Sequence, residues 1–279
     1  MTLPNFLVIG AQRAGTTLLH HILDSHPEVY VPRRRKEIHY FDWYFERGPD
    51  WYARFFPNRR EAQQYRAIGE VTPDYLFDLA APGRIKASLP DCKFVVSLRN
   101  PVDRAFSWYL FSLRSVNEKR GPEEFFAQET GCLQRGCYAE QLKRYFAIFP
   151  KDAFAVLIYE EFVRDPAAHL ASLAGFLGLT SVWQDPGSLL QQRVNASEIP
   201  RFQAAFARAQ RFGEVLTRHD LDWIVRLART CGIPKIFGTR SYRPPLPARV
   251  RRTLADYYRE EVAGLERLLG RDLGAWVMG

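Results

Sequence analysis

A short glycine-bounded loop near the start of the sequence carries residues that can bind a phosphate-like anion. Gly10 and Gly15 have the spacing of a Walker A loop, with an apolar segment before them and an amphipathic one after them. Backbone N–H groups at the start of such a helix favour an anion. Thr16 and Thr17 add hydroxyl donors, and Arg13 adds a cation. The loop is therefore either an anion cradle or a structural turn.

The Walker lysine position argues against hydrolysis of a nucleoside triphosphate. Thr16 stands where that motif requires lysine, and we find no convincing strand that ends in an aspartate suited to hold Mg²⁺. Phosphoryl transfer by this fold class depends on both features. Arg13 instead offers a planar charged fork to a terminal phosphate or its neighbour.

A second segment, residues 94–114, has the composition of another anion pocket. An apolar strand ends at Arg99, Asn100 is placed to cap a helix, and Pro101 suits its first turn. Ser107 follows two turns into that helix. Arg99 and Ser107 can therefore converge on one anion, although a residue such as Ser107 can also be a solvated or capping side chain.

The elements that position these residues follow an alternating order. Apolar runs of strand length cover residues 6–9, 67–71, 94–98 and 154–159. Helical patterns lie between or after them, at residues 17–24, 102–114, 139–148 and 166–177. Strands that alternate with helices predict an α/β fold, a central parallel sheet flanked by helices. Ligands of such sheets gather at the carboxyl ends of the strands, where both motifs lie.

We predict one domain over residues 1–279, because no repeat, low-complexity tract or long linker divides the chain. The apolar pattern of residues 196–236 predicts amphipathic helices, which suit a lid over a ligand site, a packing layer or a dimer contact. An apolar stripe after the Pro-rich residues 242–252 predicts a final helix.

Together the two motifs resemble those of sulfotransferases that use 3′-phosphoadenosine 5′-phosphosulfate (PAPS). The chain has G-x-x-x-x-G-T-T after its first strand and R-N-P-x-x-R-A-x-S-x-Y later. The resemblance implies a P-loop-like fold in which Gln12, Arg13, Ala14, Gly15, Thr16 and Thr17 bind the 5′ end of the cofactor. It further implies that Arg99 and Ser107 hold its 3′-phosphate. A sulfuryl donor has no γ-phosphate to clamp, which accounts for the missing lysine.

A third segment, "KEIHYFD" from Lys36, is similar to the catalytic segment of heparan sulfate and related bacterial sulfotransferases. The resemblance implies that Glu37 is the catalytic base, with His39 as its orienting partner or an alternative base. Lys36 is expected to place a positive charge at the reaction centre, together with Arg13. A carboxylate within hydrogen-bond distance can take the proton of an attacking hydroxyl. Without the resemblance, Glu37 would be interpreted as a surface carboxylate and His39 as a histidine packed among aromatic residues.

Acceptor-side and peripheral residues follow from the same resemblance. Tyr75, in "GEVTPDYL", is expected to bind the acceptor, as Glu37 is, whereas Tyr138 and Arg240 are expected beside the cofactor. Val71 stands where heparan sulfate 3-O-sulfotransferases carry a catalytic lysine. The sequence departs from that subgroup at this position.

Composition limits the remaining function classes. The net charge of +8 suits a polyanionic ligand, and without a nucleic-acid motif we expect a small charged cofactor and no nucleic acid. Four scattered cysteines predict reduced thiols, and without companion ligands at zinc spacing no metal is expected. The sequence contains no apolar run long enough to cross a membrane, so we predict no membrane span. An early core strand and the Arg-rich composition suggest a cytoplasmic, bacterial protein.

The sequence therefore predicts a PAPS-dependent sulfotransferase that acts on a hydroxyl, or an amine, of a carbohydrate or specialised metabolite. It is expected to be a monomer or a homodimer. A P-loop small-molecule kinase is one alternative, although Thr16 deprives it of its lysine. A non-catalytic polyanion-binding protein is another, but it gives Glu37 no role beside two anion pockets.

Overall fold

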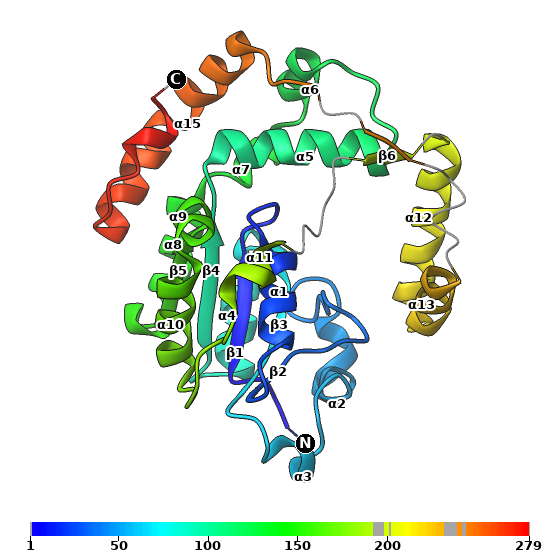
Figure 1. The fold of residues 1–279 in the computed structure, drawn as a ribbon, viewed down its shortest axis with the longest axis vertical. Helices are drawn as coiled ribbons and strands as arrows, with labels where there is room; N and C mark the ends of the chain where they lie inside the picture. Colours follow the sequence, from blue (N-terminus) through cyan, green and yellow to red (C-terminus); the bar gives the residue numbers. More distant parts are fainter. Residues whose placement is uncertain (1, 192–197, 201, 232–238, 242–243, 279) are drawn as a thin grey trace.

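A five-stranded parallel sheet with helices on both faces forms the body of the protein (Figure 1). The computed structural model describes residues 2–191, 198–200, 202–231, 239–241 and 244–278. The strands are β1 (Phe6–Gly10), β2 (Val29–Tyr30), β3 (Ala67–Val71), β4 (Lys93–Leu98) and β5 (Phe154–Ile158). Their order in the sheet is β2-β3-β1-β4-β5, and every neighbouring pair is parallel. This confirms the predicted α/β fold.

The helices occupy the segments between strands and the second half of the chain. They are α1 (Thr16–Asp24), α2 (Gly48–Ala53), α3 (Arg59–Ala62), α4 (Ala81–Ser88), α5 (Pro101–Ser115), α6 (Pro122–Gln128), α7 (Thr130–Gln134), α8 (Tyr138–Phe146), α9 (Tyr159–Arg164), α10 (Pro166–Leu177), α11 (Pro186–Gln191), α12 (Gln203–Arg218), α13 (Asp222–Thr230) and α15 (Ala248–Leu269). The observed bounds of the predicted elements lie within one or two residues of the sequence prediction. Strand β2 is absent from that prediction because two residues are too few to leave a periodic pattern, and β5 stops one residue early because Tyr159 begins α9.

Strand β1 separates two hydrophobic cores. Successive side chains of a strand point to opposite faces of the sheet. Phe6 and Val8 accordingly join the core that includes residues of α1 and α10, whereas Leu7 and Ile9 join the core that includes residues of α5, α8 and α15. All four side chains are fully buried. The sheet is covered on both faces, as its continuous apolar strands predict.

The carboxyl ends of β3, β1 and β4 lie side by side, because these strands are neighbours in the sheet. The predicted anion loop follows β1, the "TPDY" segment follows β3, and α5 follows β4. The segment with Lys36 and Glu37 lies between β2 and the short helix α2. The topology thus brings the predicted site segments to one edge of the sheet.

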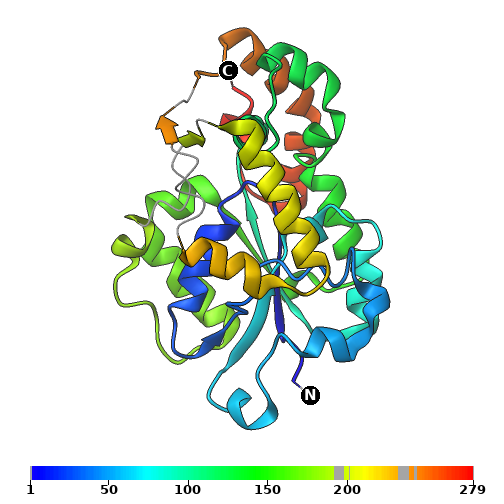
Figure 2. The same ribbon diagram turned by 90° about the vertical axis from the view of Figure 1, so that its right-hand side faces the viewer.

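Helices α12 and α13 stand at one side of the molecule in Figure 1 and face the viewer in Figure 2. They confirm helices in the middle region, but this region also contains strand β6 (Glu198–Pro200), antiparallel to β7 (Thr239–Ser241). Residues 196, 197, 201 and 232–236 of the predicted helical region lie outside the described residues. All four cysteines are free, as predicted. Within the described part of the chain, no helix has the length and apolar character needed to cross a membrane.

Candidate active site

The loop after β1 leaves the start of helix α1 open to an anion. Gly15 caps the helix with φ of 83°, no side chain caps it, and its first turn contains no acidic residue. The first N–H groups of a helix lack intrahelical partners. A Cβ atom at Gly15 would lie 2.6 Å from the ring of Tyr159, so glycine is required by space as well as by backbone conformation.

The two threonines of the loop have different surroundings. The side chain of Thr16 is buried at the helix start. Oγ1 of Thr17 accepts a hydrogen bond of 3.1 Å from Nζ of Lys36. Ala14 is buried, and its backbone N–H donates to the carbonyl oxygen of Ala11 at 3.1 Å, so Ala14 serves the shape of the loop.

Arg13 joins the two predicted anion motifs. Its Nε donates to Oγ of Ser107 at 3.2 Å, and Nη1 of Arg99 donates to the carbonyl oxygen of Arg13 at 3.4 Å. The predicted residues Arg13, Arg99 and Ser107 therefore lie together, with Arg13 turned toward the second motif. Arg13 has φ of 68°, an uncommon value for a residue other than glycine.

The positive charges around Arg13 are crowded. Burial lowers the pKa of Arg13, and the charges of Arg114, Arg99 and Arg104 lower it further, to about 10. Arg13 and Arg114 also lie over the ring of Phe111, at 5.0 and 5.6 Å. A cluster of like charges around an arginine whose pKa is lowered is suited to an anion, which would relieve the repulsion.

Several buried polar atoms in and beside this cluster are unsatisfied within the described part of the chain, including Nε and Nη1 of Arg104. Nε of Arg99 and Oε1 of Gln12 have no hydrogen-bond partner among the described residues. The guanidinium of Arg99 lies 5.1 Å from the ring centroid of Tyr159. Because a buried polar group without a partner costs stability, Nε of Arg99 and Oε1 of Gln12 are candidates for ligand contacts.

The residues from Lys36 to His39 form a second charged group. Nζ of Lys36 donates to Oε1 of Glu37 at 2.6 Å, and Nε2 of His39 faces Oε2 of Glu37 at 3.6 Å. Because Lys36 also bonds Thr17, this group lies directly against the anion loop. The structure thus brings together Lys36, Glu37 and His39, three of the four residues predicted for catalysis, whereas Arg13 bonds to Ser107. His39 holds φ of 58°.

Both partners of the Glu37–His39 contact have shifted pKa values. Burial raises the pKa of Glu37, but the contacts with His39 and Lys36 outweigh it and lower the pKa to about 2. Burial lowers the pKa of His39, but its contacts with Asp42 and Glu37 outweigh it and raise the pKa to about 9. At neutral pH the site therefore holds a carboxylate between an imidazolium and an ammonium.

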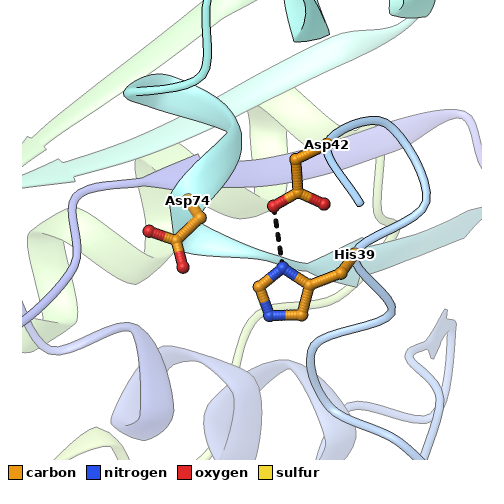
Figure 3. Close-up of side chains that lie close together, drawn as sticks. All are labelled: His39, Asp42 and Asp74. Atoms are coloured by element: carbon orange, nitrogen blue, oxygen red, sulfur yellow. Dashed lines mark hydrogen bonds and ion pairs between the residues drawn. The ribbon is translucent and has the colours of Figure 1, made fainter. Parts of the chain in front are cut away.

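His39 also belongs to a group of three titratable side chains, shown in Figure 3. Ligand atoms of His39, Asp42 and Asp74 lie within 4.8 Å of one another. Nδ1 of His39 is 2.7 Å from Oδ2 of Asp42, and Asp74 is paired with Arg135. Each side chain thus has a partner within the protein, and the arrangement fits an aspartate that orients a histidine.

A buried glutamate, Glu70, holds the segment that follows Lys36 in place. Its carboxylate accepts hydrogen bonds from Tyr52, Thr72 and Tyr75 at 2.7, 2.7 and 2.9 Å. The hydroxyl oxygens of Thr72 and Tyr75 accept in turn from the backbone N–H groups of Ile38 and Tyr40, at 3.1 and 2.8 Å. Burial raises the pKa of Glu70, although these three hydrogen bonds counteract it.

The expected contact between Tyr75 and the acceptor does not fit this geometry. The side chain of Tyr75 is 0% exposed, and its hydroxyl is engaged by Glu70 and by the backbone of Tyr40. Tyr75 is a support of the catalytic segment. Glu70 lies inside the "GEVTPDYL" segment, but its residue type alone did not predict this supporting role.

Tyr138 likewise supports a predicted site residue, the backbone of Arg99, from the protein interior. It is 1% exposed, and its hydroxyl donates to the carbonyl oxygen of Arg99 at 2.9 Å. The predicted direct contact with a cofactor is therefore replaced by a contact with the backbone of Arg99. Asn100 caps α5 as predicted, with Oδ1 accepting from the N–H groups of Val102 and Asp103. The side chain of Arg240, in β7, lies outside what the structure describes.

Comparison with known proteins agrees with this geometry. Residues 3–197 match the family model described as "Sulfotransferase domain". Human bifunctional heparan sulfate N-deacetylase/N-sulfotransferase 3 is 29% identical, over 99% of this chain and 31% of that protein. Human heparan sulfate glucosamine 3-O-sulfotransferase 6 is 33% identical, over 65% of this chain and 54% of that protein.

A solved structure resembles the whole chain. The crystal structure of a sulfotransferase from Alicyclobacillus acidocaldarius has a TM-score of 0.72 and 27% identity, and the match covers 99% of both chains. The alignments with the human proteins leave much of those longer proteins unmatched. The alignments span about half or less of the length of those two relatives.

Proposed function

Because the chain belongs to the sulfotransferase family, we propose that it moves the sulfuryl group of PAPS to an acceptor hydroxyl. The acceptor is a carbohydrate or a specialised metabolite. The names of the two human relatives, an N-sulfotransferase and a 3-O-sulfotransferase, support a carbohydrate acceptor and include both an amine and a hydroxyl as acceptor groups. Val71, in place of the expected lysine, argues against 3-O-sulfation of heparan sulfate.

One observation carries this proposal: Lys36 connects the anion loop to the candidate base. Its Nζ contacts Oγ1 of Thr17 on one side and Oε1 of Glu37 on the other. A donor bound at the start of α1 would therefore place its sulfur next to Lys36. Arg13 of the anion loop contacts Ser107 and Arg99 of the second motif. This proximity is what two phosphate groups of one nucleotide would require.

The chemistry follows from these positions. The acceptor oxygen attacks sulfur and gives its proton to Glu37, while the bond between sulfur and the bridging oxygen breaks. Lys36 and the hydroxyl of Thr17 are placed to stabilise the charge that develops on the departing phosphate. A carboxylate with a pKa of about 2 is a weak base, because His39 and Lys36 both hold it in its charged form. Transfer therefore requires that these contacts weaken when the donor binds, and Lys36, which already reaches Thr17, can turn toward the phosphate. Asp42 keeps His39 in its orientation.

Calorimetric titration of the metal-free protein tests the donor assignment. We expect 3′-phosphoadenosine 5′-phosphate (PAP) to bind at least tenfold more tightly than ADP, because only PAP fills the pocket of Arg99 and Ser107. Transfer of labelled sulfuryl from PAPS to a panel of carbohydrates and phenols then identifies the acceptor. Preference for Mg-ATP would favour the kinase alternative, and absence of nucleotide binding would favour the polyanion-binding alternative.

A cytoplasmic location, and a monomer or homodimer, belong to the same proposal and rest on composition. Gel filtration with light scattering measures the oligomeric state, and fractionation of the expressing cells measures the location.

A further inference from the structure

The turn between α12 and α13 contacts the residue that precedes the catalytic pair. Nε and Nη2 of Arg35 donate to the two carboxylate oxygens of Asp222, at 2.8 and 2.7 Å. This is the bidentate geometry that an arginine and a carboxylate favour. The two side chains are only 4% and 7% exposed, although 187 residues separate them in sequence.

Further contacts fix the turn around the same guanidinium. Nη2 of Arg35 also donates to the carbonyl oxygen of Thr217 at 2.7 Å and to Asp220 at 3.1 Å. The other carboxylate oxygen of Asp220 accepts from Arg47 at 2.9 Å and from Nε1 of Trp51 at 3.0 Å. The turn is therefore held by charge-assisted hydrogen bonds to two separate segments of the body.

Apart from this turn, α12 and α13 expose much of their apolar surface. Phe212 on α12 is 64% exposed, and Trp223 and Leu227 on α13 are each 55% exposed. Helix α12 also packs against α5, so the pair is held at two places, and the turn is the place that contacts the segment with Arg35. The buried ion pair between Arg35 and Asp222 is the most enclosed of those that the structure describes at this turn.

The catalytic segment is consequently held at two points. At one, Thr72 and Tyr75 receive the N–H groups of Ile38 and Tyr40. At the other, Asp222 holds Arg35, which directly precedes Lys36 and Glu37. A displacement of the α12–α13 turn must therefore move or release the residues that contact Thr17 and the acceptor.

We propose that Asp222 is a positioning residue for sulfuryl transfer, which acts through Arg35 to hold Lys36 and Glu37 in their reactive places. This inference rests on the proposed function for its catalytic consequence. Its structural part, the coupling of the α12–α13 turn to residues 35–40, can be measured without turnover. Asp222 itself touches neither donor nor acceptor in this role.

The test compares Asp222→Asn with Asp24→Asn. Asp24 also pairs with an arginine of the same segment, Arg33, at 2.7 Å, but this pair is exposed and ends two residues before Arg35. Arg35→Lys serves as a second variant, because it keeps the positive charge and removes the bidentate geometry. Hydrogen exchange of the peptide that contains residues 35–41, PAP affinity and steady-state kinetics with PAPS are measured for each protein.

We expect Asp222→Asn and Arg35→Lys to raise the hydrogen-exchange rate of residues 35–41 at least tenfold, without a comparable rise in the strands of the sheet. We expect kcat to fall at least tenfold, whereas the Kd of PAP stays within about twofold of the wild-type value. Asp24→Asn should change none of these. A rise in exchange confined to residues 35–41 would uphold the coupling even if the wild-type protein transferred no sulfuryl group.

Unchanged exchange and unchanged kcat in both Arg35 and Asp222 variants would overturn the inference. So would an equal loss in Asp24→Asn, because the effect would then come from charge alone. If the variants failed to bind PAP and exchanged rapidly throughout the sheet, the pair would be a general stabiliser, which also contradicts a positioning role.

Discussion

Nζ of Lys36 lies 2.6 Å from Oε1 of Glu37, so the candidate base is held by the residue beside it. Together with His39, this contact keeps the pKa of the Glu37 carboxyl low, so the free protein holds a weakly basic carboxylate. On the proposed function, a phosphate bound at the start of α1 would compete with Glu37 for Lys36, which already reaches Thr17. Donor binding would then release one of the two contacts that keep the base weak.

Replacement of the base should separate chemistry from binding. We expect Glu37→Gln to lower kcat by about 10²- to 10⁴-fold, the usual contribution of a general base, with PAP affinity within about threefold of wild type. Rapid-quench measurement of sulfuryl transfer and calorimetry with PAP test the two parts. The matched control is Glu140→Gln on α8, whose side chain is 74% exposed. Unchanged turnover in Glu37→Gln would remove this residue from the role of base.

The arginine of the second motif should discriminate between nucleotides. We expect Arg99→Ala to weaken PAP binding by about 10- to 100-fold, as loss of a charge-assisted hydrogen bond does, and to leave the weaker binding of ADP nearly unchanged. Calorimetry measures both affinities, with the exposed Arg60→Ala as a control. An equal loss for PAP and ADP would place Arg99 away from the 3′-phosphate.

His39 should make stability depend on alkaline pH. Its pKa rises from 6.5 to about 9 on folding, so its contribution is fully present below pH 6.5 and is lost as the pH rises through about 9. The contribution is at most about 3 kcal/mol, from 1.36 kcal/mol for each pKa unit. Urea unfolding of wild type and His39→Gln between pH 6 and 10 should give a difference in unfolding free energy that shrinks as pH increases. A difference that stays constant would contradict the pKa shift.

Glu37 should act in the opposite direction at acidic pH. Its pKa falls from 4.5 to about 2 on folding, so its contribution is present above pH 4.5 and is lost as the pH falls through about 2. Acid unfolding followed by circular dichroism should therefore begin at a higher pH in Lys36→Met, which removes one of the charges that lower this pKa. Identical acid transitions in both proteins would argue against the Lys36 contact in solution.

Tyr75→Phe distinguishes a support from an acceptor contact. The change removes the hydroxyl that joins Glu70 to the backbone of Tyr40. We expect a loss of about 1–3 kcal/mol in unfolding free energy, because a buried carboxylate loses a partner, and a lower kcat with an unchanged KM for the acceptor. Tyr257→Phe, at a half-exposed position of α15, is the control. A higher acceptor KM with full stability would restore the contact that the sequence suggested.

Much of the architecture could be predicted because local patterns determine it. Four strands, the cap at Asn100 and the family follow from apolar runs, turn chemistry and two specific motifs, and all are confirmed. The proximity of Arg13, Arg99 and Ser107 followed from the rule that parallel strands present their carboxyl ends at one edge. The catalytic and binding roles of these residues remain predictions.

Side-chain roles were less predictable because residue type does not reveal burial. Tyr75 and Tyr138 carry hydroxyl groups suited to a ligand, yet both hydroxyls bond to protein atoms in the interior. The pairing of Arg35 with Asp222 joins segments 187 residues apart. A run of arginines before Lys36 has the same appearance whether it is solvated or buried, so no local signal indicates this contact.

The crowding of arginines around Arg13 implies that a bound nucleotide would also affect the stability of the folded protein. Mutual repulsion among these guanidinium groups opposes folding as long as no anion is present. A ligand that binds only the folded chain adds stability in proportion to the logarithm of its concentration. If the proposed donor is this anion, the cellular abundance of the protein should follow the supply of that donor, and cells short of activated sulfate should degrade the protein sooner.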